Sequence, residues 1–198
     1  MTERTVSYPC PVCLKRDNKS EIRRREDGLF FCSKCGSKLN ERQIKNKLSK
    51  LHDLRIASVY IKERNRRLGS SFRSPEEGDD PPDVISSDSG GDRLQIEICK
   101  YAPDFWAELL GKGTVSGAVD PIKWLIDALR VKVKKNYDVQ YRKQLVLLLE
   151  GNVIADDFFE KNEKHFLELS FNKNALEKLG FKEVWYVSLT RSKAYQVY

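Results

Sequence analysis

The chain has 198 residues, 40% of them apolar, which is enough for one domain with a hydrophobic core and a smaller module beside it. Its net charge of +7 is uneven, because residues 1–73 carry 19 Lys and Arg against 8 Asp and Glu, whereas residues 74–198 carry 17 against 21. No apolar run approaches a membrane span and no signal peptide opens the sequence, so we expect a cytoplasmic protein without membrane contact.

Two pairs of cysteines near the N-terminus have the spacing of a zinc site. Cys10 and Cys13 form one CxxC pair, and Cys32 and Cys35 form a second pair after eighteen intervening residues. Zinc prefers four soft ligands in a tetrahedron, and each CxxC turn supplies two thiolates from one tight knuckle. The spacing therefore predicts one structural Zn²⁺. The alternative, two disulfides, is rare in a chain without a secretion signal.

The segment between the two pairs predicts a small antiparallel hairpin. Residues 21–26 and 29–31 are strand-like and flank Asp27-Gly28, a dipeptide typical of two-residue turns. With Gly36 directly after the last cysteine, residues 1–38 resemble the zinc-ribbon family, from which Leu14 departs because glycine is common there. The resemblance implies a scaffold that binds nucleic acid or protein. The candidate nucleic-acid contacts in this ribbon are Arg23, Arg24 and Arg25.

Residues 39–69 predict a basic helix that follows the ribbon. Asn40 is a candidate N-cap and Gly69 a stop signal. This helix could pack on the ribbon, form a homodimer through residues 39–68, or lie along a phosphate backbone. Its apolar stripe comprises Ile44, Leu48, Leu51, Leu54, Ile61 and Leu68. Its candidate phosphate contacts are Arg64, Arg66 and Arg67.

Residues 70–80 are rich in Ser, Pro, Gly and Asp and predict a linker, after which residues 81–198 predict one layered α/β domain. The pattern alternates between short strands and helices. The strands are expected at residues 83–86, 93–99, 143–150, 183–189 and 194–197. The helices are expected at residues 103–110, 121–135 and 172–179.

Two carboxylates in this domain are candidate ligands of a catalytic ion. Along residues 93–99 apolar and polar side chains alternate, so Glu97 lies on the face opposite Leu94. Asp83 begins the preceding strand, and turn residues between the two strands predict a hairpin that brings Asp83 toward Glu97. Two converging carboxylates repel each other unless a divalent cation lies between them, which favours Mg²⁺ or Mn²⁺.

These residues and the order of elements resemble the restriction-endonuclease-like PD-(D/E)xK nucleases. Pro82-Asp83 matches the first half of that motif and Glu97 the acid of the second half, which implies an α/β/α domain with a mixed central sheet. The family lysine is replaced by Cys99, so the resemblance makes the adjacent Lys100 the candidate for that role. The resemblance also makes Gln95, on the same face as Glu97, a candidate for positioning the water or the metal. Family members whose lysine has moved to a helix make two further residues candidates, Lys123 and Lys132.

The basic N-terminal part and the carboxylate pair together suggest a metal-dependent nuclease whose ribbon holds the substrate, with DNA as the expected partner. The alternative is a non-catalytic adaptor that binds nucleic acid or protein and carries a degenerate nuclease fold. A simpler interpretation makes Asp83 a turn residue and Glu97 a salt-bridge partner, and the arginines solvated surface. Asp120 and Asp127 form a second acidic pair, but they lie two helical turns apart and rank below Asp83 and Glu97.

Overall fold

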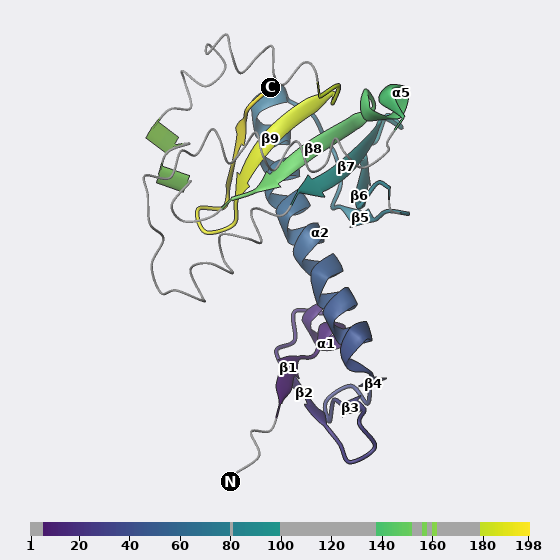
Figure 1. The fold of residues 1–198 in the computed structure, drawn as a ribbon. Helices are drawn as coiled ribbons and strands as arrows, with labels where there is room; N and C mark the ends of the chain where they lie inside the picture. The colour runs from purple at the N-terminus through teal and green to yellow at the C-terminus, as the bar shows by residue number, and fades with distance from the viewer. Residues whose placement is uncertain (1–5, 80, 100–137, 152–155, 158–159, 162–178) are drawn as a thin grey trace, which may run out of the picture. The chain divides into compact units, whose positions relative to one another are not determined.

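The computed structural model describes residues 6–79, 81–99, 138–151, 156–157, 160–161 and 179–198. These residues form two compact units, 1–53 and 54–198, each with its own β-sheet. Figure 1 shows the elements of both units along the chain. The boundary between them falls inside the long helix α2 (Glu41–Leu68).

The first unit contains a four-stranded antiparallel sheet with the strand order β1-β2-β3-β4. Its elements are β1 (Ser7–Pro9), α1 (Pro11–Leu14), β2 (Glu21–Arg24), β3 (Phe30–Phe31) and β4 (Lys38–Leu39). The expected hairpin joins β2 to β3, but its loop has three residues, 26–28, one more than predicted. Arg25 N–H donates to Leu29 O and Gly28 N–H to Arg25 O, with Gly28 at φ +78°. Glycine adopts this left-handed conformation without strain.

Helix α2 begins and ends where its sequence predicts. The Asn40 side chain accepts from Gln43 N–H, and the Gln43 side chain accepts from Asn40 N–H, both at 2.9 Å. This reciprocal pair is a capping box. At the other end Gly69 has φ +64°, the conformation that terminates helices.

The predicted apolar stripe of α2 is only partly correct. Ile44 is buried in the first unit, with Cys10, Ile22 and Phe30. Further along, the buried residues are Ile56, Ala57, Tyr60 and Ile61, whereas Leu68 is 55% exposed. Leu68 therefore does not belong to the buried face. Pairing of this helix with a second copy stays a prediction.

The second unit is built on a six-stranded mixed sheet with the order β10-β9-β8-β7-β6-β5. Strands β7, β8 and β9 are parallel, and the outer strands on both sides are antiparallel to their neighbours. This arrangement confirms the predicted mixed sheet. The bounds are β5 (Glu76–Glu77), β6 (Val84–Ser87), β7 (Arg93–Cys99), β8 (Leu145–Glu150), β9 (Glu183–Ser188) and β10 (Lys193–Gln196), with a short helix α5 (Val139–Arg142) before β8.

The two faces of this sheet bury different clusters. One face packs against the C-terminal half of α2, as Figure 1 shows. Its residues include Leu94, Ile96 and Ile98 from β7 and Val146 and Leu148 from β8. The opposite face buries Cys99, Leu145, Leu147, Leu149 and Tyr186. The alternation predicted for residues 93–99 is therefore present.

Part of the segment predicted as a linker is bound to the sheet. Within it, β5 pairs with β6, with Glu76 opposite Ile85. Just before β5, the Asn65 side chain donates a hydrogen bond to Phe72 O and accepts one from Phe72 N–H. Arg73 N–H donates to Ser87 O. Backbone hydrogen bonds thus order a stretch that buries little apolar surface.

The three predicted helices at residues 103–110, 121–135 and 172–179 lie outside the described residues, apart from Leu179. Where the structure does describe the chain, no helix has the length and apolar character that crossing a bilayer requires.

A largely buried ion pair joins α2 to β9 within the second unit. Arg64 Nη2 lies 3.2 Å from Glu183 Oε1, and both side chains are less than 15% exposed. Glu183 Oε2 accepts from Trp185 Nε1–H at 2.9 Å and from the Tyr60 hydroxyl at 3.3 Å. Burial and the charge of Glu183 raise the pKa of Tyr60. Glu183 is therefore the shared acceptor for three donors.

We expect Glu183→Ala to lower the free energy of unfolding by about 3 kcal/mol, because it leaves the Arg64 guanidinium buried without its carboxylate. Urea denaturation followed by tryptophan fluorescence measures the change. The matched control is Arg66→Ala, which removes a side chain that is 68% exposed and leaves Glu63 paired with Arg67, so it is expected to cost less than about 1 kcal/mol. Equal losses in the two variants would contradict the assignment.

Candidate metal centre and ribbon surface

Four cysteine sulfurs in the first unit form a cluster that could hold a zinc ion. The Sγ atoms of Cys10, Cys13, Cys32 and Cys35 all lie within 4.8 Å of one another. Cys10 and Cys35 are 3.6 Å apart, and Cys13 and Cys32 are 3.7 Å apart. A zinc ion with four bonds of about 2.3 Å places its sulfurs about 3.8 Å apart, so the cluster has the right size. These separations also exclude disulfides, whose S–S bond is about 2.05 Å.

The two CxxC pairs reach this cluster through different turns. In the first, α1 carries Cys13 and Leu14 in a helical turn, with Leu14 N–H donating to Cys10 O. Leu14 therefore needs no left-handed conformation, which falls instead on Asp17 at φ +55°. In the second, Gly36 has φ +73° and its N–H donates to Cys32 O. The left-handed conformation that favours glycine therefore occurs directly after Cys35, at Gly36, and does not occur directly after Cys13.

Two serine hydroxyls next to the sulfurs complete the cluster, and sequence reasoning did not identify either. Ser37 Oγ lies 3.0 Å from Cys35 Sγ, and Ser20 Oγ lies 3.4 Å from Cys32 Sγ. Hydrogen bonding from Ser37 lowers the pKa of Cys35. Burial raises the pKa of Cys32, but hydrogen bonds from Ser20 and from backbone N–H groups outweigh it and lower that pKa. Thiolates are the form that binds zinc.

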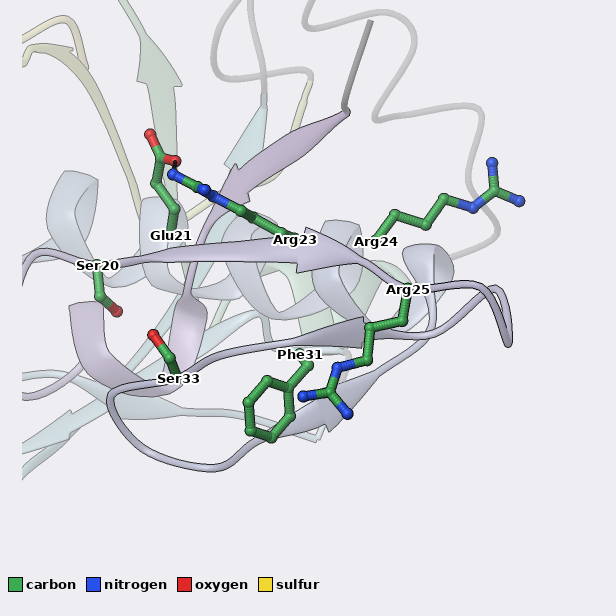
Figure 2. A pocket seen from close by; sticks show the side chains of 7 residues that line it. All are labelled: Ser20, Glu21, Arg23, Arg24, Arg25, Phe31 and Ser33. Carbon is green, nitrogen blue, oxygen red and sulfur yellow. Dashed lines mark ion pairs between the residues drawn. The ribbon is translucent and has the colours of Figure 1, made fainter. Parts of the chain in front are cut away.

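The ribbon also carries a basic hollow on its surface, shown in Figure 2. The hollow has a volume of about 500 Å³, and residues of the paired strands β2 and β3 and of the segments next to them line it. It is lined by Ser20, Glu21, Arg23, Arg24, Arg25, Phe31 and Ser33. Figure 2 shows the Arg25 side chain descending onto the Phe31 ring, with its guanidinium carbon 3.9 Å from the ring centroid. All three predicted arginines thus belong to the lining of one hollow, and Arg25 is the one that lies over Phe31.

In the second unit, the predicted carboxylate pair lies at the end of the β6–β7 hairpin. Val84 pairs with Ile96, so the same register places Asp83 opposite Glu97. Asp83 Oδ2 accepts from Ile98 N–H at 2.8 Å, which extends the hairpin by a side-chain hydrogen bond. This bond gives Asp83 a structural role at the hairpin end. Among the described residues, only the four cysteines form a group of three or more Cys, His, Asp or Glu that could share an ion.

Glu97 lies on the face of β7 that the sequence predicts. It is fully buried and pairs in register with Leu147, whose side chain belongs to the cluster opposite α2. Cys99 lies on the same face and is 5% exposed. Tyr141 packs against this cluster, and burial together with the charge of Glu97 raises the pKa of its hydroxyl. Gln95 is half-buried two residues before Glu97.

The three arginines predicted in α2 all have acidic partners. Arg64 pairs with Glu183, while Arg66 and Arg67 both pair with Glu63, which lowers the pKa of Glu63 to about 2. The other predicted basic and acidic candidates lie outside the described residues. They are Lys100, Lys123, Lys132, Asp120 and Asp127.

Sequence reasoning missed a buried carboxylate beside β9. Asp156 is 2% exposed, and its two oxygens accept from the hydroxyls of Tyr186 and Ser188, each at 2.7 Å. A Cβ atom at Gly151 would overlap the Tyr186 hydroxyl. Tyr186 and Ser188 share one face of β9 by alternation, which is the only signal for this cluster in the sequence.

Comparison of the chain with known protein families, with curated proteins and with solved structures finds no match.

We expect Cys32→Ser to abolish stoichiometric zinc binding and to unfold the ribbon, because three thiolates do not complete a closed structural site. Zinc bound per chain after gel filtration, and the rate of tryptic cleavage within residues 6–40, measure the two effects. Cys99→Ala is the matched control, since Cys99 is a buried thiol outside the cluster. Zinc retained by Cys32→Ser, or lost by Cys99→Ala, would contradict this assignment.

Proposed function

We propose that the chain is a zinc-stabilised nucleic-acid-binding protein whose ribbon contacts the phosphate backbone, with DNA as the expected partner. The observation that carries this proposal is the hollow of about 500 Å³ whose lining includes Arg23, Arg24, Arg25 and Phe31. Arginine is well suited to this role because its planar guanidinium binds phosphate through two parallel hydrogen bonds and stays charged at any physiological pH.

The charge around the hollow supports the proposal. Residues 1–53, the unit that carries the hollow, have 13 Lys and Arg against 7 Asp and Glu, a formal charge of +6. Four thiolates and one zinc ion together reduce this by about two units, which leaves the unit basic. The three arginines of the hollow are exposed, and Glu21 is the only acidic residue that lines it. A concentrated positive potential of this kind attracts a polyanion.

We expect binding of the zinc-loaded chain to a DNA oligonucleotide to weaken linearly on a plot of log affinity against log salt concentration. Arg23→Gln should reduce the magnitude of that slope by about 1, because one phosphate contact releases about one counterion. Fluorescence anisotropy at several salt concentrations measures it. Arg16→Gln, which removes an exposed arginine outside the hollow, is the control and should leave the slope unchanged. A slope near zero for the unmodified chain would contradict the proposal.

A second candidate function, metal-dependent phosphodiester hydrolysis, is favoured by the register that places Asp83 opposite Glu97. The strands support it further, because β5, β6 and β7 form an antiparallel meander and β8 adds parallel to β7. The strands β6, β7 and β8 correspond to the three strands of the strand, strand, helix, strand order on which the nuclease resemblance is based, and β5 is an additional edge strand; the expected intervening helix lies outside the described residues.

In this second candidate, Asp83 and Glu97 would hold Mg²⁺ or Mn²⁺. The ion would polarise the phosphodiester, activate a water and stabilise the leaving oxygen. Gln95 would assist from the same face of β7, and Lys100 would supply positive charge to the transition state. Cys99 supplies no positive charge, because a cysteine side chain stands at the position where the family has lysine.

We expect Glu97→Gln to reduce Mg²⁺- or Mn²⁺-dependent cleavage of plasmid DNA by on the order of 100-fold, because the metal contributes several kcal/mol to transition-state stabilisation. Glu76→Gln is the matched control, since Glu76 is an exposed carboxylate on β5 of the same sheet. Agarose gel electrophoresis of time courses measures nicking, with circular dichroism to check folding. Equal cleavage by the two variants, or none by the unmodified chain with either metal, removes this site from consideration.

A further inference from the structure

The solvent face of the ribbon carries a row of side chains that crosses all four strands. Ser7 on β1 is opposite Arg23 on β2, Arg23 is opposite Phe31 on β3, and Phe31 is opposite Lys38 on β4. Residues directly opposite each other point to the same face of a sheet. An aromatic ring therefore stands between two cations, with neighbouring strands about 4.8 Å apart.

This row differs from the other face of the same sheet, where the ribbon has its core. Phe30, the neighbour of Phe31, is 2% exposed and packs with Ile22 and Ile44. Phe31 points the other way and is only half-buried. Its ring is therefore not part of the core and is presented to the basic hollow, as Figure 2 shows.

Arg25 covers one face of the Phe31 ring. The Arg25 guanidinium lies over the ring, with its central carbon 3.9 Å from the centroid. A guanidinium held over an aromatic ring presents its own planar, positively charged group, the kind of surface on which a nucleobase stacks. The hollow beside this pair has a volume of about 500 Å³, within the usual range for small-molecule sites.

Glu21, the acidic residue in the lining of the hollow, does not prevent Arg23 from binding a phosphate. Glu21 Oε2 lies 3.5 Å from Arg23 Nη2, and both side chains are more than half exposed. An exposed ion pair of this length is weak, so Arg23 can turn to a phosphate without a large loss. Lys38, on the other side of Phe31, is also exposed.

We propose that this hollow binds one unpaired nucleobase against the Arg25–Phe31 pair, with the flanking phosphates at Arg23 and Lys38, so that the ribbon prefers single-stranded nucleic acid. The inference rests on the proposed nucleic-acid binding and adds the form of its ligand. In a duplex the base faces are stacked on one another and cannot reach Phe31, whereas an unpaired base can. Phosphate contacts alone would not distinguish the two forms in this way.

The test measures binding of the zinc-loaded full chain to a fluorescently labelled single-stranded DNA, to the same sequence as a duplex, and to the matching single-stranded RNA. We expect the single strands to bind more tightly than the duplex at equal salt. Phe31→Leu should weaken single-strand binding by about 5- to 150-fold, the range for loss of one base–aromatic stack. Its effect on duplex binding should be less than about 3-fold.

Two further variants separate stacking from folding and from charge. Arg25→Lys keeps the positive charge but loses the planar group, so it should weaken single-strand binding while leaving the salt slope unchanged. Leu29→Ala, which alters an exposed apolar residue outside the lining of the hollow, should have no effect. Zinc content and circular dichroism confirm that each variant is folded.

The outcomes distinguish this inference from the proposed function on which it rests. Salt-dependent binding with equal affinity for single strand and duplex, unchanged in Phe31→Leu and Arg25→Lys, would overturn the stacking site and leave nucleic-acid binding intact. No binding to any of the three probes would overturn both. Weaker binding of the DNA than of the RNA strand, or the reverse, with both affected by Phe31→Leu, supports the site and identifies the preferred sugar.

Discussion

The four-cysteine cluster is the constraint on which the first unit depends. Its buried apolar residues are few, chiefly Ile22, Phe30 and Ile44 around the cysteines themselves. A core of this size rarely overcomes the conformational entropy of its chain, and small modules of this kind usually gain the missing stability from a metal or disulfides. The strand register on the ribbon surface follows from that cluster, so the alignment of Arg23, Phe31 and Lys38 depends on it as well.

Helix α2 contributes to the core of each unit with different residues. Ile44 belongs to the core of the first unit, whereas Ile56, Tyr60 and Ile61 belong to the core of the second. Each half of the helix therefore needs its own apolar face. A single apolar stripe along the whole helix wrongly predicts that Leu68 is buried. The arginines near that end have acidic partners, and Arg64 in particular pairs with the largely buried Glu183. That pair joins α2 to β9 within the second unit.

The sequence predicts those parts of the structure that local chemistry determines. The capping box at Asn40, the left-handed Gly36 and Gly69, and the alternation along β7 each depend on residues within a few positions of one another. Contacts between distant segments leave no such pattern. The hydroxyls of Tyr186 and Ser188 donate hydrogen bonds to Asp156, about thirty residues earlier in the chain, and sequence periodicity does not predict these contacts. The four-cysteine cluster was predictable because two local turns reveal it, whereas the neighbouring hydroxyl of Ser20 follows only from the folded ribbon.

The two proposed functions depend on separate physical requirements. Nucleic-acid binding needs only the cations and the aromatic ring of the ribbon, all of which the structure places around one hollow. Hydrolysis needs two carboxylates, a metal and a positive charge on one side of the β7 strand. The observed alternation fixes Cys99 on the face of Glu97 within an apolar cluster, so the strand itself offers no ammonium there. Catalysis would therefore need a lysine or arginine from another segment of the chain. Nucleic-acid binding by the ribbon does not depend on such a residue.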